Sequence, residues 1–140
     1  MERKRIAAVL TWYVPGSHSD VLVGKFLPGR GIALDDGFHP LRVDLVSIYL
    51  DQTPTKRNGG EAQSNDIGLA LAEEHGVEVY SSIREALCCS HGPGGELAVD
   101  GVIVVGEHGD CELLTTTHTQ QRPRTAAAYS TVCVARCPGF

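Results

Sequence analysis

One stretch of the sequence reads Gly101-Val102-Ile103-Val104-Val105-Gly106-Glu107-His108-Gly109-Asp110. Its four consecutive β-branched residues are typical of a strand that is buried on both faces, as in a parallel sheet. The turn that follows places Glu107, His108 and Asp110 directly after this strand. Because ligands of open α/β sheets bind beyond the carboxyl ends of the strands, these three side chains are the first candidates for a site.

The composition is that of a globular chain and excludes several classes of function. Of the 140 residues, 42% are hydrophobic and 21% are charged, which is enough for one domain with its own core. The net charge of -5 provides no basic face for nucleic acid. No apolar run approaches the ~20 residues of a membrane span, and the five cysteines lack the paired spacing of a zinc knuckle. We therefore expect a cytoplasmic protein with reduced thiols and with no nucleic-acid or membrane partner.

Three further apolar segments alternate with helix-like segments before this strand. The expected strands cover 6–14, 41–50 and 77–80, and the expected helices cover 21–27, 64–75 and 82–87. Loops rich in Gly, Asp and Pro separate them at 29–41 and 52–63. Ser82 and Glu85 have the spacing of a capping box, and Gly76 stands where a left-handed residue after a helix is expected. The alternation predicts an α/β fold with a Rossmann-like parallel sheet and helices on both faces.

Four short motifs follow one another between residues 43 and 110. They are Ser47-Ile48-Tyr49-Leu50-Asp51, Ala72-Glu73-Glu74-His75-Gly76-Val77, Ser82-Ile83-Arg84-Glu85-Ala86-Leu87 and Val99-Asp100-Gly101-Val102-Ile103-Val104. Their shared order resembles the N-terminal, nucleotide-binding half of the glucose-fructose oxidoreductase / inositol dehydrogenase superfamily. The whole stretch is also similar to an uncharacterised bacterial group of oxidoreductase-like proteins. The resemblance implies a small-molecule nucleotide partner, with NAD or NADP as the cofactor.

The turn after the first expected strand departs from the glycine motif of dinucleotide-binding proteins. It reads Tyr13-Val14-Pro15-Gly16-Ser17-His18-Ser19-Asp20 and keeps a single glycine. The helix start and its hydroxyls favour an anion there, whereas Asp20 opposes a phosphate. Asp51 is placed either as an acceptor for a ribose hydroxyl or as an ordinary turn residue. The candidates for a nucleotide contact are Gly16, Ser17, His18, Asp51, Glu107 and His108.

The catalytic half of that family has no counterpart in this sequence. Its catalytic lysine belongs to a Glu-Lys-Pro motif after the fifth strand, and this chain has no such motif. We therefore assign no catalytic residue and do not expect hydride transfer by this polypeptide alone.

A strand order of 3-2-1-4 would place the turns after the first and fourth strands across one crevice. His18 would then lie near His108 and Asp110, which are ligand types that suit zinc or a general acid/base pair. Three interpretations stay open: carboxylates that cap turn amides beside an exposed histidine, contacts to a nucleotide or another small molecule, and a metal site of His18, His108 and Asp110.

Residues 111–140 differ in character from residues 1–110. They contain one acidic residue and three arginines, and only Thr131-Val132-Cys133-Val134-Ala135 has the composition of a strand. We hypothesise that the reading frame was lost near Asp110, so that the Rossmann-like domain (1–110) is truncated after its fourth strand. The alternative is a genuine, weakly structured extension. Loss of a fifth strand would expose a sheet edge through which the chain could self-associate.

Three functions follow from these features. The first is a nucleotide-binding domain of an oxidoreductase-like protein, without its catalytic half. The second is a non-enzymatic module that binds a small ligand or a metal, and the third is a truncated product with no independent function.

Overall fold

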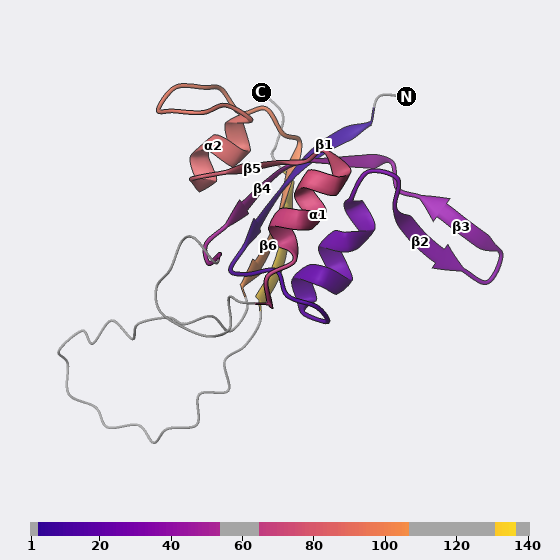
Figure 1. Ribbon diagram of the computed structural model, residues 1–140. Helices are drawn as coiled ribbons and strands as arrows, with labels where there is room; N and C mark the ends of the chain where they lie inside the picture. Colours follow the sequence, from indigo (N-terminus) through magenta and orange to yellow (C-terminus); the bar gives the residue numbers. More distant parts are fainter. Residues whose placement is uncertain (1–2, 54–64, 107–130, 137–140) are drawn as a thin grey trace, which may run out of the picture.

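The computed structural model describes residues 3–53, 65–106 and 131–136 (Figure 1). Its main sheet has five strands in the order β5-β4-β1-β6-β7. Their bounds are β1 (Lys4–Leu10), β4 (Val43–Leu50), β5 (Glu78–Tyr80), β6 (Gly101–Gly106) and β7 (Thr131–Arg136). The first four run parallel to one another, and β7 runs antiparallel to β6. The predicted α/β fold with a parallel sheet is confirmed, and its parallel strands have the expected order.

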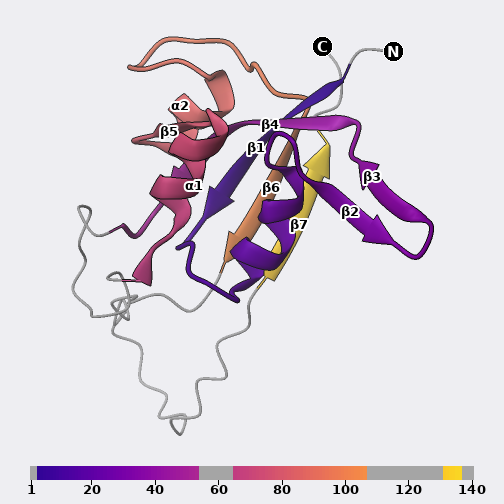
Figure 2. The same ribbon diagram turned by 45° about the vertical axis from the view of Figure 1, so that its right-hand side comes forward.

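The main core covers one face of this sheet. Two short helices after β1 lie there side by side with α1 (Gly68–His75), as Figures 1 and 2 show: η1 (Ser19–Val23), a π-helix, and η2 (Gly24–Phe26), a 3₁₀ helix. Alternate residues of β1 point into this core, which is built from Ile6, Ala8, Leu10, Tyr13, Val23, Leu27, Leu45, Ile48, Leu50, Ala72, Val77, Ile103 and Val105. The first strand was expected to extend to Val14 but ends at Leu10, and the short helix expected over 21–27 begins earlier, at Ser19.

Helix α2 (Ile83–Cys88) covers part of the opposite face. Ser47 and Ala86 are fully buried, and the Ser47 hydroxyl donates a hydrogen bond of 2.7 Å to the Ala86 carbonyl. Further along this face, Val102 and Val104 of β6 are only half-buried, so the expected burial of that strand on both faces is incomplete. Within the described ranges, no helix combines the length and the apolar composition that crossing a membrane requires.

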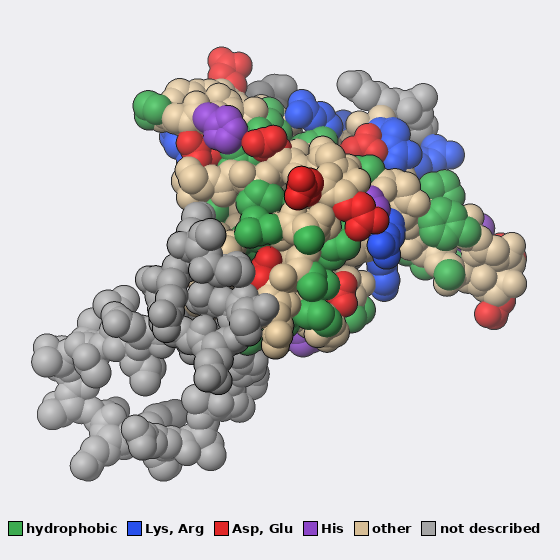
Figure 3. Space-filling view, in the orientation of Figure 1, with side chains coloured by type: hydrophobic (Ala, Val, Ile, Leu, Met, Phe, Trp, Pro, Cys, Tyr) green, Lys and Arg blue, Asp and Glu red, His purple; other side chains and the backbone are tan. Residues whose placement is uncertain are grey.

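Residues 29–41 were expected to be a loop, but they contain a second, two-stranded sheet. Strands β2 (Gly31–Leu34) and β3 (Gly37–Pro40) pair antiparallel around Asp35 and Asp36. The hairpin projects from the body (Figure 1), and Figure 3 shows hydrophobic side chains on it. Its residues Leu34 and Phe38 are exposed. The overlooked signal is an acidic two-residue turn between two short apolar segments.

The C-terminal strand corrects one expectation and confirms another. Residues 131–136 pair with β6 along its full length, as Figure 2 shows, so β6 is not the exposed edge that the sequence suggested. The strand expected at 131–135 is confirmed. The loss of a reading frame near Asp110 stays a hypothesis, because residues 107–130 lie outside the described part of the chain.

Candidate functional site

The carboxyl ends of the parallel strands meet at one rim of the sheet. Leu10 at the end of β1 pairs with Leu50 of β4 and with Val105 of β6. The Asp51 amide donates a hydrogen bond of 2.9 Å to the Leu10 carbonyl. The turns after β1 and β4 therefore start at the same rim, which the end of β6 shares. Glu107, His108 and Asp110 lie outside the described residues, so their approach to His18 stays a prediction.

The turn after β1 satisfies its own amide groups. The Gly16 amide, in a left-handed conformation with φ of 74°, donates to Asp20 Oδ2 at 2.9 Å. The Asp20 amide in turn donates to Ser17 Oγ at 3.2 Å. The Asp20 carboxylate thus lies where a pyrophosphate would have to accept, and His18 is exposed at the start of η1. The structure brings Gly16, Ser17 and His18 together in one turn. In this turn, the Gly16 amide already donates to the Asp20 carboxylate.

Asp51 lies apart from this turn, at the end of β4. Its side chain is exposed, and Oδ1 accepts a hydrogen bond of 3.1 Å from the Tyr49 hydroxyl. Partial burial, with a smaller contribution from Asp51, raises the pKa of Tyr49 above its usual value. The exposed carboxylate keeps free acceptor positions, as a ribose-binding aspartate requires.

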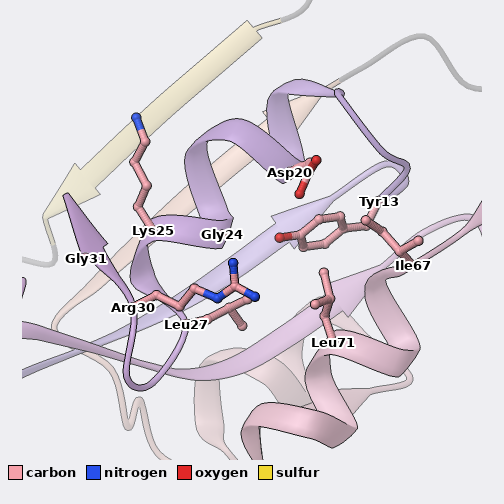
Figure 4. A pocket seen from close by; sticks show the side chains of 9 residues that line it. All are labelled: Tyr13, Asp20, Gly24, Lys25, Leu27, Arg30, Gly31, Ile67 and Leu71. Carbon is pink, nitrogen blue, oxygen red and sulfur yellow. The ribbon is translucent and has the colours of Figure 1, made fainter. Parts of the chain in front are cut away.

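A pocket of about 290 Å³ opens between the η1–η2 segment and α1 (Figure 4). Its apolar wall is formed by Leu27, Ile67 and Leu71. The remaining lining residues are Tyr13, Asp20, Gly24, Lys25, Arg30 and Gly31. The pocket therefore combines charges of both signs with an aliphatic surface.

The Tyr13 hydroxyl is buried in this pocket and has no hydrogen-bond partner among the described residues. The residue is 0% exposed, and burial, followed by the charge of Asp20, raises its pKa to about 12 although Arg30 acts in the opposite direction. A Cβ atom on Gly24 would lie 3.4 Å from the hydroxyl oxygen, so the glycine leaves space beside it. Two further atoms without a partner, Asp66 Oδ2 and His75 Nε2, belong to side chains that form hydrogen bonds through their other polar atom.

The start of α1 is hydrogen-bonded to the backbone of Tyr13. The Ile67 amide donates to the Tyr13 carbonyl at 2.8 Å, and a Cβ atom on Gly68 would lie only 2.7 Å from the Tyr13 Cβ. Asp66 Oδ1 accepts a hydrogen bond of 3.3 Å from the Leu69 amide, and burial raises the pKa of this carboxyl group. The close approach at Gly68 fixes the distance between α1 and the tyrosine ring.

Arg30 is the cation that faces the hydroxyl. Figure 4 shows its guanidinium directed toward the Tyr13 hydroxyl, whereas the Lys25 amine points away from it. Neither cation forms an ion pair with another described residue. The Arg30 amide donates to the Leu27 carbonyl, and His75 Nδ1 donates to the Pro28 carbonyl, both at 2.9 Å. The hydrogen bond from His75 holds the segment that carries Arg30 against the end of α1.

A second polar cluster lies around α2 and confirms part of the predicted capping box. Ser82 Oγ accepts the Glu85 amide at 3.2 Å. The Glu85 carboxylate accepts hydrogen bonds from the Ser81 hydroxyl and, at 2.6 Å, from the Gly92 amide. These two hydrogen bonds, in that order, lower the pKa of Glu85 to about 2. The glutamate therefore holds the loop after α2 as well as the helix start.

The described part of the chain contains no group of three or more His, Cys, Asp or Glu residues suited to a metal ion. Of the zinc ligands expected from the sequence, only His18 lies within it. Comparisons with known proteins found no matching family model, no similar curated protein and no similar solved structure. The superfamily resemblance thus rests on the sequence motifs alone.

The pocket was missed in the sequence because its residues come from distant segments without a shared motif. Tyr13 carried the strongest available signal, since a tyrosine that follows an apolar strand must place its hydroxyl somewhere polar. Arg30 stood in a segment interpreted only as a loop.

Proposed function

We propose that the chain is a ligand-binding α/β domain and that its pocket takes a small organic carboxylate. The observation that carries this proposal is the buried Tyr13 hydroxyl, which faces the Arg30 guanidinium and lacks a hydrogen-bond partner within the described part of the chain. Leaving a buried hydroxyl unpartnered costs roughly 1–3 kcal/mol, and such groups are uncommon in folded proteins. A ligand oxygen bound by Arg30 would supply the acceptor that the hydroxyl lacks.

The charges of the pocket favour a carboxylate over a phosphate. The planar guanidinium of an arginine matches the two oxygens of a carboxylate, and the side chain of Arg30 has no competing ion pair with another described residue. Asp20 lines the same pocket and would repel the greater charge of a phosphate. Leu27 and Leu71 favour a ligand with an apolar part.

Binding rather than catalysis is the activity that these groups support. With a pKa of about 12, Tyr13 stays protonated at neutral pH and acts as a hydrogen-bond donor. A guanidinium group donates hydrogen bonds and has no acceptor position, so neither group serves as a base. Together they provide two donors for one acceptor group.

The test is a titration of the ¹⁵N-labelled chain with 3-methylbutanoate, followed by amide chemical shifts. Shifts at Gly24, Arg30 and Leu71 that saturate below about 10 mM, a binding free energy of roughly 3 kcal/mol, are the expected result. Inorganic phosphate at the same concentration is the control and should leave the chemical shifts of these amides unchanged. Absence of saturable shifts at the pocket, or shifts only elsewhere, would show that the proposal is wrong.

Nucleotide binding at the sheet rim is the second candidate. It is favoured by the exposed Asp51 carboxylate, which follows β4 beside the end of β1. It is opposed by the Asp20 carboxylate, which already accepts the Gly16 amide. We expect that NADH or NADPH, followed by fluorescence, binds weakly and that Asp51→Ala abolishes this binding. Equal binding by Asp51→Ala, or no binding by the unaltered chain, would contradict this candidate.

A further inference from the structure

We infer, on the basis of the carboxylate binding proposed above, that the ligand is an α-amino acid with a small aliphatic side chain. An amino acid carries a carboxylate and an ammonium group on one carbon atom. The pocket presents a cation, an anion and an aliphatic wall around one hydroxyl group. The cation matches the carboxylate of such a ligand, the anion matches its ammonium group, and the aliphatic wall matches its side chain.

Asp20 supplies the position for the ammonium group. Figure 4 shows its carboxylate on one side of the Tyr13 ring and the Arg30 guanidinium on another. Asp20 Oδ2 accepts the Gly16 amide, whereas Oδ1 would lie 3.9 Å from a Cβ atom on Gly24, a residue that lines the pocket. Oδ1 is therefore available on the pocket side to accept a hydrogen bond from an ammonium group.

A ligand without an ammonium group would offer the Asp20 carboxylate no hydrogen-bond donor. Its carboxylate would neutralise Arg30 but would place a second negative charge near Asp20. Two carboxylates in one small site disfavour each other, whereas an ammonium group between them removes the repulsion. A zwitterion thus satisfies Asp20 and Arg30 at once.

The size and the wall of the pocket limit the side chain of the ligand. A volume of about 290 Å³ lies at the small end of the range for ligand sites. Leu27, Ile67 and Leu71 provide methyl groups and no charge at the wall. Branched aliphatic side chains fit such a surface better than charged or aromatic ones.

The experiment is a calorimetric titration of the full chain with three matched probes. These are L-valine, 3-methylbutanoate, which lacks the ammonium group, and 2-methylpropylamine, which lacks the carboxylate. We expect valine to bind at least about tenfold more tightly than either analogue, as for other charge-assisted hydrogen bonds. In Asp20→Asn, whose side-chain oxygen can still accept the Gly16 amide, valine should lose this advantage over 3-methylbutanoate. Glu74→Gln removes an exposed acid outside the pocket and should preserve it.

The outcomes separate this inference from the proposed function. Equal affinity for valine and 3-methylbutanoate overturns the amino acid and leaves the carboxylate pocket intact. Binding of the amine as tight as that of valine overturns the amino acid and the role of Arg30. No binding of any probe overturns both proposals. If Asp20→Asn does not fold, the ranking of the three probes on the unaltered chain still decides between these outcomes.

Discussion

The two polar clusters of this domain differ in whether their hydrogen bonds are complete. Around α2, the Glu85 carboxylate accepts from both Ser81 and Gly92, and its pKa falls to about 2. In the pocket, the Tyr13 hydroxyl has no partner among the described residues, and its pKa rises to about 12. A polar group that is fully satisfied stabilises the fold, whereas one that is buried without a partner makes the fold less stable. The contrast separates a structural polar group from one that, in the function proposed above, binds a ligand.

The two clusters also differ in how the sequence builds them. The α2 cluster comes from twelve consecutive positions, 81–92, so that local chain geometry completes its hydrogen bonds. The pocket combines the turn after β1, the segment before the hairpin and the first turns of α1. Substitutions at α2 should therefore change stability, and substitutions in the pocket should change binding.

The largest effect is expected from Arg30→Gln. Losing one charged donor to a ligand carboxylate should weaken binding of 3-methylbutanoate by about 10- to 100-fold, which corresponds to ~1.5–3 kcal/mol. The urea midpoint should stay unchanged, because Arg30 is exposed and has no ion pair with a described residue. Lys25→Gln removes a neighbouring cation that points away from the hydroxyl and should retain the affinity within about threefold. Similar losses in the two variants would contradict the assignment to Arg30.

Gly68→Ala should lower both the stability of the chain and its affinity for 3-methylbutanoate, because Gly68 packs directly against Tyr13. The added Cβ would be 2.7 Å from the Tyr13 Cβ and 3.1 Å from Leu50 Cδ1. Overpacking of this kind costs about 1–3 kcal/mol of unfolding free energy, which urea denaturation measures. Gly94→Ala is the matched control, since its Cβ would meet no atom within 4 Å. A Gly68→Ala chain as stable as the control would show that the close packing is wrong.

A pH-dependent effect is expected from Glu85→Gln. The pKa of Glu85 is about 2 in the folded chain and 4.5 ordinarily, so its ionised form stabilises the fold above pH 4.5. This contribution is lost as the pH falls from about 4.5 towards 2. Melting temperatures between pH 7 and pH 3 should therefore fall less steeply for Glu85→Gln than for the unaltered chain. The exposed Glu73 serves as the control: Glu73→Gln should retain the original slope, and an equal slope in all three chains would contradict the role of Glu85.

The sheet was predictable from the sequence because its strands β1 and β6 contain continuous apolar runs. The β-branched run at 102–105 and the run at 6–10 each predicted a strand, and the two lie side by side. The hairpin β2–β3 was not predicted, since its exposed residues follow no burial pattern and its glycines and aspartates are typical of a loop. Hydrophobic patterning reports burial, and the hairpin is exposed.

The site was less predictable than the sheet. Sequence alone drew attention to Gly16, Ser17 and His18 because they follow a strand, and this position at the rim is correct. The hydrogen bond from the Gly16 amide to the Asp20 carboxylate could not be predicted, because it depends on the turn conformation that the chain adopts. The pairing of Tyr13 with Arg30 depends on tertiary contacts between distant segments, which no local motif encodes.

The central claim is that Tyr13 serves a ligand rather than the fold, and Tyr13→Phe tests it most directly. The decisive measurement is the affinity of this variant for 3-methylbutanoate by calorimetry, with its urea midpoint as the reference for folding. We predict an affinity about three- to tenfold lower, together with a stability that is equal or higher by up to about 1 kcal/mol, because the hydroxyl forms no hydrogen bond with residues 3–53, 65–106 or 131–136. Unchanged affinity together with reduced stability would contradict the claim.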